Sequence, residues 1–157
     1  MSRLCKILVA FLLVAVMSMS LCACDGEKPQ EGTTAPQTQA TLDEAALLWN
    51  DATYTEETSL GKGDTLFDFK VIAGDNSVTF HIATNKENLG EALLEHELVA
   101  GDEGPYGLYV KYVNGIYADY DVNGCYWSFT KNGEMMMTGV DGETIEAGAC
   151  YEMTYTK

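Results

Sequence analysis

Residues 66–82, LFDFKVIAGDNSVTFHI, decide the fold of this chain. The runs 66–72 and 78–82 are rich in aromatic and β-branched residues, which favour strands. The segment Gly74-Asp-Asn-Ser77 lies between them, and such a cluster of small and polar residues is typical of a turn. The stretch therefore predicts a β-hairpin.

A helix is expected directly after this hairpin. The segment Thr84-Asn-Lys-Glu87 fits a capping box, in which the first and fourth side chains satisfy free backbone N–H groups. One face of residues 88–97 carries apolar residues at helical spacing, and Gly101 follows a few residues beyond the end. The residues on that face are Leu89, Ala92, Leu93 and His96.

Short strand-forming runs continue to the C-terminus, at 108–113, 126–130, 135–137 and 151–155. Asn-Gly or Asp-Gly dipeptides begin at positions 114, 123, 132 and 141, and they supply the positive φ that tight turns need. The order β-β-α-β-β-β predicts an α+β fold of the β-grasp type. We expect a mixed sheet of about five strands crossed by one helix.

The N-terminus has the features of a lipoprotein signal peptide over residues 1–23. Arg3 and Lys6 give a positive start, and residues 7–16 form an apolar run that is too short to span a bilayer. The segment Leu21-Cys-Ala-Cys24 resembles a lipobox, whose cysteine receives a diacylglycerol before cleavage. We therefore expect Cys24 to anchor the protein to the cell membrane, facing outside the cytoplasm. An ordinary secretory leader is the alternative.

Residues 24–47 are expected to form a flexible tether after this anchor. Residues 25–40 are rich in Gly, Pro, Gln, Thr and Glu and have almost no apolar surface to offset their ordering entropy. A further capping box, Thr41-Leu-Asp-Glu44, precedes a short apolar run. Trp49 and Tyr54 are expected to pack on the globular domain, which we place at 48–157.

The charge of the chain excludes one class of partner. It has 24 acidic and 9 basic residues, a net charge of -15. Loss of Arg3 and Lys6 with the leader would leave about −17. Such a protein repels phosphate backbones, so nucleic-acid binding is not expected. The folded domain should also avoid anionic lipid headgroups, and it suits cationic partners.

Several segments resemble a bacterial family of unknown function (DUF4430-like) that is similar to the C-terminal β-domain of transcobalamin and intrinsic factor. These segments are 49–61, 84–94, 106–110, 113–115, 118–121, 126–129 and 132–134. In transcobalamin this β-grasp domain closes over vitamin B12 held against a larger helical domain. The resemblance implies the fold and suggests cobalamin or another corrinoid as ligand. Because no helical partner domain is evident, a lone domain should bind weakly or need another protein.

Three residues are candidates for contacting a ligand. Tyr126 and Trp127 are neighbours in a predicted strand, so they face opposite sides of the sheet. One should be core, and the other could offer a flat aromatic surface to a corrin, a sugar or a peptide. Met136 belongs to a run of three methionines, whose soft side chains suit ligands of varied shape. Packing of the core and the hairpin is the alternative for all three.

A weaker candidate is a calcium site. Asp119, Asp121 and Asn123 place oxygen ligands at alternate positions before Gly124, as in the first half of a calcium loop. The twelfth position, where a bidentate Glu would complete the loop, is Thr130. We therefore expect an acidic turn without metal.

Cys125 and Cys150 are expected to form a disulfide, because two remaining cysteines in an exported domain usually pair. Closing a loop of about 25 residues would stabilise the fold by roughly 3 kcal/mol. Two separately buried thiols are the alternative.

The sequence does not point to an enzyme. His81 and His96 are the two histidines and lack metal-ligand spacing, and no nucleophile elbow, phosphate-binding loop or dinucleotide fingerprint is present. We expect a non-catalytic, lipid-anchored module without a cofactor that binds a small molecule. A protein-interaction or surface-structural module without such a ligand is the alternative.

Overall fold

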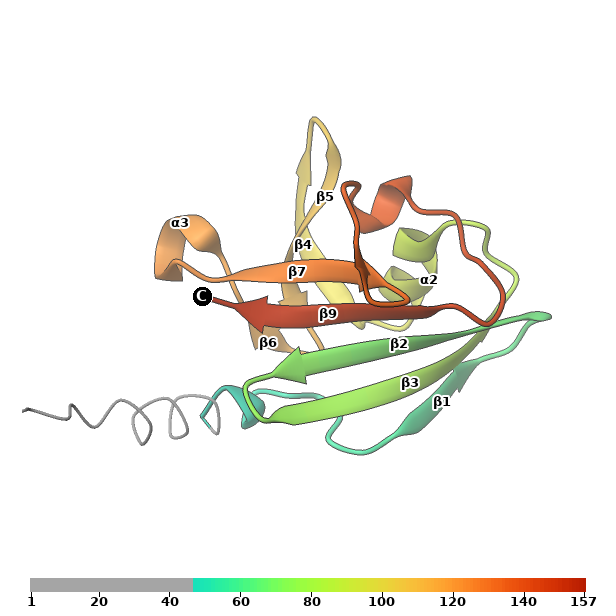
Figure 1. Cartoon of the computed structure of the whole chain (residues 1–157), viewed down its shortest axis with the longest axis horizontal. Coiled ribbons are helices and arrows are strands. Elements are labelled where there is room, and N and C mark those ends of the chain that lie inside the picture. The colour runs from blue at the N-terminus through green and yellow to red at the C-terminus, as the bar shows by residue number, and fades with distance from the viewer. Residues whose placement is uncertain (1–46) are drawn as a thin grey trace, which may run out of the picture. The chain divides into compact units, whose positions relative to one another are not determined.

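The computed structural model describes residues 47–157, which form two sheets and short helices (Figure 1). A six-stranded sheet has the order β1-β3-β2-β9-β7-β8, and a three-stranded sheet has the order β4-β5-β6. The strands are β1 (Thr58–Gly61), β2 (Thr65–Ala73), β3 (Asn76–Thr84), β4 (Val99–Gly104), β5 (Gly107–Val113), β6 (Ile116–Tyr117), β7 (Tyr126–Lys131), β8 (Glu134–Met135) and β9 (Cys150–Thr156). The helices are α2 (Leu89–Glu95), α3 (Tyr120–Asn123) and the 3-10 helix η1 (Val140–Gly142).

The expected signal peptide, the lipid anchor at Cys24, most of the tether and the capping box at 41–44 lie outside the described residues. No helix within residues 47–157 is long and apolar enough to cross a membrane.

The predicted hairpin is confirmed. Strands β2 and β3 pair antiparallel along their whole length, from Thr65 with Thr84 to Ala73 with Asn76. The two-residue connection starts at Gly74, whose φ of 61° lies in the left-handed region that glycine adopts without strain. Phe67, Phe69 and Val71 all point to the buried face, as the period of two requires.

The mixed α+β class is also confirmed, but the main sheet is larger than the five strands expected. The last strand, β9, runs parallel to β2 and antiparallel to β7, so it joins two parts of the sequence in the centre of the sheet. Strand β1 adds parallel to β3 at one edge, and β8 adds to β7 at the other. Both edge strands are short, and β1 reads Thr-Ser-Leu-Gly, which gives little strand signal.

Helix α2 forms where the helical spacing indicated, but the predicted capping box is wrong. Asn88 is the N-cap, and its side chain accepts a hydrogen bond from the Glu91 N–H at 3.1 Å. Thr84 still belongs to β3, and its hydroxyl accepts from the Lys86 N–H. Leu89, Ala92 and Leu93 of the predicted face are buried.

The core lies between the six-stranded sheet on one side and α2 with the smaller sheet on the other (Figure 1). The inward faces of β2, β3, β7 and β9 supply most of its aromatic residues. Val99, Val113 and Ile116 of the smaller sheet are buried in the same cluster. The outward face of the large sheet is therefore the one that solvent reaches.

Two of the four predicted tight turns are hairpin turns. Asn114-Gly115 joins β5 to β6, and Asn132-Gly133 joins β7 to β8, with both residues of each pair at positive φ. Gly124 instead closes α3 in the left-handed conformation. Asp141-Gly142 lies in η1, so its Gly is not at positive φ. The dipeptide thus marks a change of chain direction at all four places, and the surrounding packing decides which type of turn forms there.

Asn114 also binds the segment that precedes β1, through hydrogen bonds to the backbone of residues 53 and 54. Its side chain is fully buried; its Oδ1 accepts from the Tyr54 N–H at 2.9 Å and its Nδ2 donates to the Tyr54 carbonyl at 2.8 Å. The Thr53 N–H donates to the Asn114 carbonyl at 2.8 Å. Trp49 and Tyr54 pack against the core, as predicted, and the Tyr54 ring meets Phe80 edge to face.

Candidate functional site

An apolar groove lies between β5 and the β7–β8 hairpin, and we call it the methionine groove. Its volume is about 370 Å³, within the range of small-molecule pockets. Its lining is mostly aromatic, aliphatic and methionine side chains: Leu108, Tyr109, Val110, Tyr126, Trp127, Ser128, Phe129, Met135, Met136, Met137, Thr138, Gly139, Val140 and Met153. Neither a lysine nor an acidic residue contributes to it.

All three predicted ligand-contact residues line this groove. Trp127 is 8% exposed on the core side of β7, whereas Tyr126 is 42% exposed on the opposite side. The alternation predicted for the pair is therefore confirmed, with Trp127 as the core member. Both residues line the groove, and Tyr126 is the first residue of β7.

The Trp127 indole N–H has no hydrogen-bond partner in the part of the chain that the structure describes. The ring packs edge to face on Tyr155, with centroids 5.6 Å apart. Buried indole N–H groups usually find an acceptor, so an unpaired one beside a groove is a feature to explain.

The three methionines divide between core and surface. Met136 packs partly buried against the core, while Met135 and Met137 are exposed, Met137 to 95%. Core packing, the alternative given for Met136, therefore holds in part for this residue, which also lines the groove. Its two neighbours are exposed because β8 ends at Met135, so the alternation of a strand does not continue through the run.

The groove continues toward the tip of the β4–β5 hairpin, which stands out beyond β7 in Figure 1. A second hollow of about 400 Å³ there shares Leu108, Tyr109 and Gly139 with the methionine groove. Tyr106 at the tip is 97% exposed. The sequence did not single out Tyr109 as a site residue, because only the packing of β5 against β7 brings it to the groove. Nor did it single out Tyr106, which lines the second hollow.

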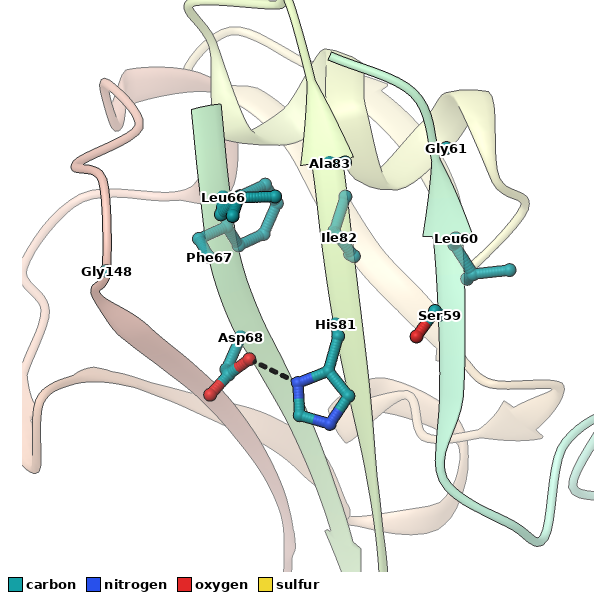
Figure 2. A pocket seen from close by; sticks show the side chains of 10 residues that line it. All are labelled: Ser59, Leu60, Gly61, Leu66, Phe67, Asp68, His81, Ile82, Ala83 and Gly148. Atoms are coloured by element: carbon teal, nitrogen blue, oxygen red, sulfur yellow. Dashed lines mark hydrogen bonds and ion pairs between the residues drawn. The ribbon is translucent and has the colours of Figure 1, made fainter. Parts of the chain in front are cut away.

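A separate hollow of about 340 Å³ lies on the outward face of the large sheet (Figure 2). Gly61 and Ala83 line this hollow and, because their side chains are small, leave space in it; the exposed Leu66 lies beside them. At one end His81 points toward Asp68, which faces it across β2 and β3. The His81 Nδ1 lies 2.6 Å from Asp68 Oδ1, and Nε2 lies 2.6 Å from Glu57 Oε1.

These contacts raise the pKa of the His81 imidazole above its ordinary value, first through the hydrogen bond to Asp68 and then through that to Glu57, against a smaller loss of hydration. We expect its NMR titration midpoint to lie above pH 6.5, with a His96→Gln variant to assign the signal. The two carboxylate contacts of the protonated imidazole also stabilise the folded protein. This stabilisation is complete below about pH 6.5, where the imidazole of the unfolded chain is protonated too. It is lost as the pH rises through the folded-state pKa of His81. Raising the salt should move the midpoint back, because the groups are half-exposed. A titration midpoint at or below pH 6.5 at low salt would show that Asp68 and Glu57 do not raise the pKa of His81.

The methionine groove is the better candidate for binding. In the outer hollow both imidazole nitrogens already have carboxylate partners, so His81 has no free nitrogen for a ligand. Along the groove, by contrast, large apolar side chains stay exposed. A bound molecule can cover such exposed apolar surface.

The calcium-like segment forms a capping turn. Asp119 is buried; its Oδ2 lies 2.7 Å from Lys111 Nζ, and its Oδ1 accepts from the Asp121 N–H. The hydrogen bond from Lys111 lowers the pKa of Asp119 despite its loss of hydration. The Asn123 Oδ1 accepts from the N–H groups of Asp119 and Cys125. These oxygens are thus already occupied, and no three His, Cys, Asp or Glu side chains within residues 47–157 are grouped to hold a metal.

The predicted disulfide is wrong for this fold. Cys125 and Cys150 are both free thiols. Cys150 begins β9, whereas Cys125 precedes Tyr126, which pairs with Thr156 at the far end of β9. The two cysteines therefore lie a strand length apart, roughly 20 Å at 3.3 Å per residue, far beyond the Cα separation that a disulfide spans.

A family model described as Domain of unknown function (DUF4430) matches residues 87–157, which include the methionine groove. No curated protein matches the chain. A crystal structure at 1.30 Å of a protein from Ruminococcus gnavus ATCC 29149, described as a candidate metal-binding protein, is similar, with a TM-score of 0.56 and 33% identity. The match covers 60% of this chain and 98% of that chain.

The crystal structure of haptocorrin in complex with Cbi is also similar, with a TM-score of 0.51 and 14% identity. The match covers 62% of this chain, which spans about a quarter (26%) of haptocorrin. At this identity the likeness concerns the fold alone. The chain belongs to the DUF4430 family and has the transcobalamin-like fold that its sequence predicts.

Proposed function

We propose that residues 48–157 are a non-catalytic binding domain that holds a small molecule in the methionine groove. The observation that carries this proposal is an open apolar groove lined by exposed methionine and tyrosine side chains. Tyrosine and methionine are enriched where proteins bind other molecules, and they adapt to a ligand with little loss of hydration. We also class the fold as β-grasp-like, on the parallel pairing of β2 with β9 and the helix across the sheet.

A corrinoid is the ligand class that we favour, because the fold is shared with haptocorrin in complex with Cbi. A corrin has a broad apolar face, which suits the methionine and tyrosine side chains along the groove. The groove and the hollow at the hairpin tip are open and would cover one side of such a molecule. A second protein that covers the other side would raise the affinity.

Titration with cobalamin tests this function. A Trp49→Phe variant leaves Trp127 as the single tryptophan, and we expect cobalamin to quench its emission. Met136→Ala should weaken binding about tenfold, because it removes apolar contact area from the groove. Leu66→Ala, an exposed apolar residue at the outer hollow, is the matched control and should leave the affinity unchanged. A flat titration up to millimolar cobalamin would contradict the corrinoid proposal.

A second candidate is a protein-interaction module. The exposure of Tyr106 at the hairpin tip and of Met137 along the groove favours it, since such residues often become buried in interfaces. Cross-linking on intact cells separates the two functions. A specific protein partner in the absence of any small-molecule binding would support this second function against the first.

We further propose that the domain is displayed outside the cytoplasm on a lipid anchor at Cys24. The support is the lipobox-like Leu21-Cys-Ala-Cys24 behind a short apolar run. Mass spectrometry of the native protein should find residues 1–23 removed and the Cys24 sulfur acylated. An intact leader with an unmodified thiol would contradict the anchor and leave the groove's binding role to be judged by titration.

A further inference from the structure

We propose that Gly139 determines the size of the molecule that the methionine groove accepts. Because this residue has no side chain, the groove stays open to the hollow at the tip of the β4–β5 hairpin. A ligand whose apolar face is broad enough to enter both hollows is then favoured over one that fills a single hollow. This inference rests on the proposed binding function and adds a specificity-determining residue and the size class of the ligand.

Gly139 lies where the two hollows meet. It lines both of them, together with Leu108 and Tyr109. On one side of these shared residues the groove extends to Met136, and on the other side the hollow extends to Tyr106 on the hairpin tip. A molecule that contacts Met136 and Tyr106 at the same time therefore passes the three shared residues.

The space at Gly139 is open. A β-carbon added there would meet one atom of another segment within 4 Å in the described part of the chain, the Leu108 carbonyl oxygen at 3.9 Å, which is ordinary contact. The backbone has φ −74° and ψ 173°, angles that any residue adopts. The local backbone therefore tolerates a side chain at position 139, and that side chain would project into the space that joins the two hollows.

The walls of this junction are held by hydrogen bonds. The Leu108 N–H donates to the Asp141 Oδ2 at 2.6 Å, and the Gly142 N–H donates to the Gly139 carbonyl at 3.0 Å. The Asn88 side chain donates to the Asp141 carbonyl at 2.6 Å, which binds η1 to the N-cap of α2. A larger side chain at position 139 should therefore narrow the passage, because the hairpin is not free to move away.

The lining of both hollows suits one continuous apolar face. Among the described residues, no charged side chain lines either hollow. Tyr106, Tyr109 and Met137 are all exposed along them. A ligand that covers both hollows removes these apolar surfaces from water together, whereas a ligand in one hollow leaves part of them exposed. The additional buried area favours the broader molecule.

Titration of Gly139→Leu and Gly139→Ala with a broad and a small probe tests this inference. Cyanocobalamin is the broad probe, and p-cresol, a single ring, is the small one. In NMR spectra the Met136 methyl reports the groove and the Tyr106 ring reports the hairpin tip, with Met136→Ala and Tyr106→Ala to assign the signals. In the parent protein we expect cyanocobalamin to shift both signals with one Kd.

Gly139→Leu should weaken cyanocobalamin binding about tenfold, whereas Gly139→Ala should stay within about threefold of the parent protein. The small probe should shift the Met136 methyl of Gly139→Leu with unchanged affinity, which also shows that the variant is folded. Ala100→Leu adds an apolar side chain at an exposed position of β4 outside both hollows. It is the matched control and should bind cyanocobalamin as the parent protein does.

The outcomes separate the two proposals. If cyanocobalamin shifts the Met136 methyl but not the Tyr106 ring, or binds Gly139→Leu as tightly as the parent protein, the inference is overturned and the binding function stands. Binding of p-cresol alone to the parent protein would overturn it too. If neither probe shifts any groove signal, the proposed function fails and the inference fails with it.

Discussion

We expect Tyr151→Ala to lower the free energy of unfolding by about 3–5 kcal/mol, the range for deleting a large buried aromatic ring. Tyr151 is fully buried in β9, where its ring stacks on Phe129 and meets Phe67 edge to face. Its hydroxyl accepts from the Glu146 N–H at 2.9 Å and donates to the Thr144 carbonyl at 3.3 Å. One side chain thus joins three strands and the loop that precedes β9.

Urea denaturation followed by circular dichroism measures this change. Tyr151→Phe is the matched control, because it keeps the ring and removes only the hydroxyl, and it should cost about 1–2 kcal/mol. Tyr106→Ala, at the exposed hairpin tip, should stay within about 0.5 kcal/mol of the parent protein. A Tyr151→Ala protein as stable as Tyr151→Phe would show that the ring does not organise the core.

Asn114→Ala is expected to cost about 2–5 kcal/mol, from two causes that add. The substitution removes the two hydrogen bonds to the half-buried Tyr54 backbone, at about 0.5–1.5 kcal/mol for each. It also places an alanine at φ 51°, in the left-handed region that costs a residue with a β-carbon roughly 1–2 kcal/mol. Thermal unfolding should show the loss as a clear fall in Tm.

Two variants separate the contribution of the hydrogen bonds from that of the backbone strain. Asn114→Gly removes the hydrogen bonds but tolerates the backbone angle, so it should be more stable than Asn114→Ala. Asn132→Ala makes the same change at the β7–β8 turn, where φ is 52°, the asparagine is exposed and its Oδ1 accepts one hydrogen bond, from the Cys150 N–H. It should cost less than Asn114→Ala. Equal losses at the two turns would mean that the two hydrogen bonds to Tyr54 contribute no more than the single exposed one at Asn132.

Local patterns were sufficient to predict the hairpin and the main helix. Residues 66–82 combine strand-forming runs with a glycine turn, and residues 88–97 place Leu89, Ala92 and Leu93 on one face. The missed strands have physical reasons. Strand β1 contains one strongly apolar residue, and β4 is Val-Ala-Gly-Asp-Glu-Gly, which pairs with β5 through its backbone and is mostly exposed. Such strands depend on their neighbours more than on their own side chains.

The candidate site was predictable only in part. Trp127 and Met136 are conspicuous in the sequence, and both line the groove. The wall from Leu108 to Tyr109 depends on β5 lying beside β7, which no local pattern encodes. The prediction of a disulfide is wrong for the same reason. Spacing along the chain makes Cys125 and Cys150 plausible partners, but the antiparallel register of β7 and β9 puts them at opposite ends of a strand.

The buried amide of Asn114 would have a mechanical consequence if the proposed anchor holds the protein by its N-terminus. Tension applied at residue 47 meets the two hydrogen bonds between Asn114 and Tyr54 before it reaches β1, which pairs only with β3 at one edge of the large sheet. The methionine groove belongs to the opposite edge, at β7 and β8. Under such tension residues 47–61 would therefore detach first, and the residues that line the methionine groove would keep their arrangement.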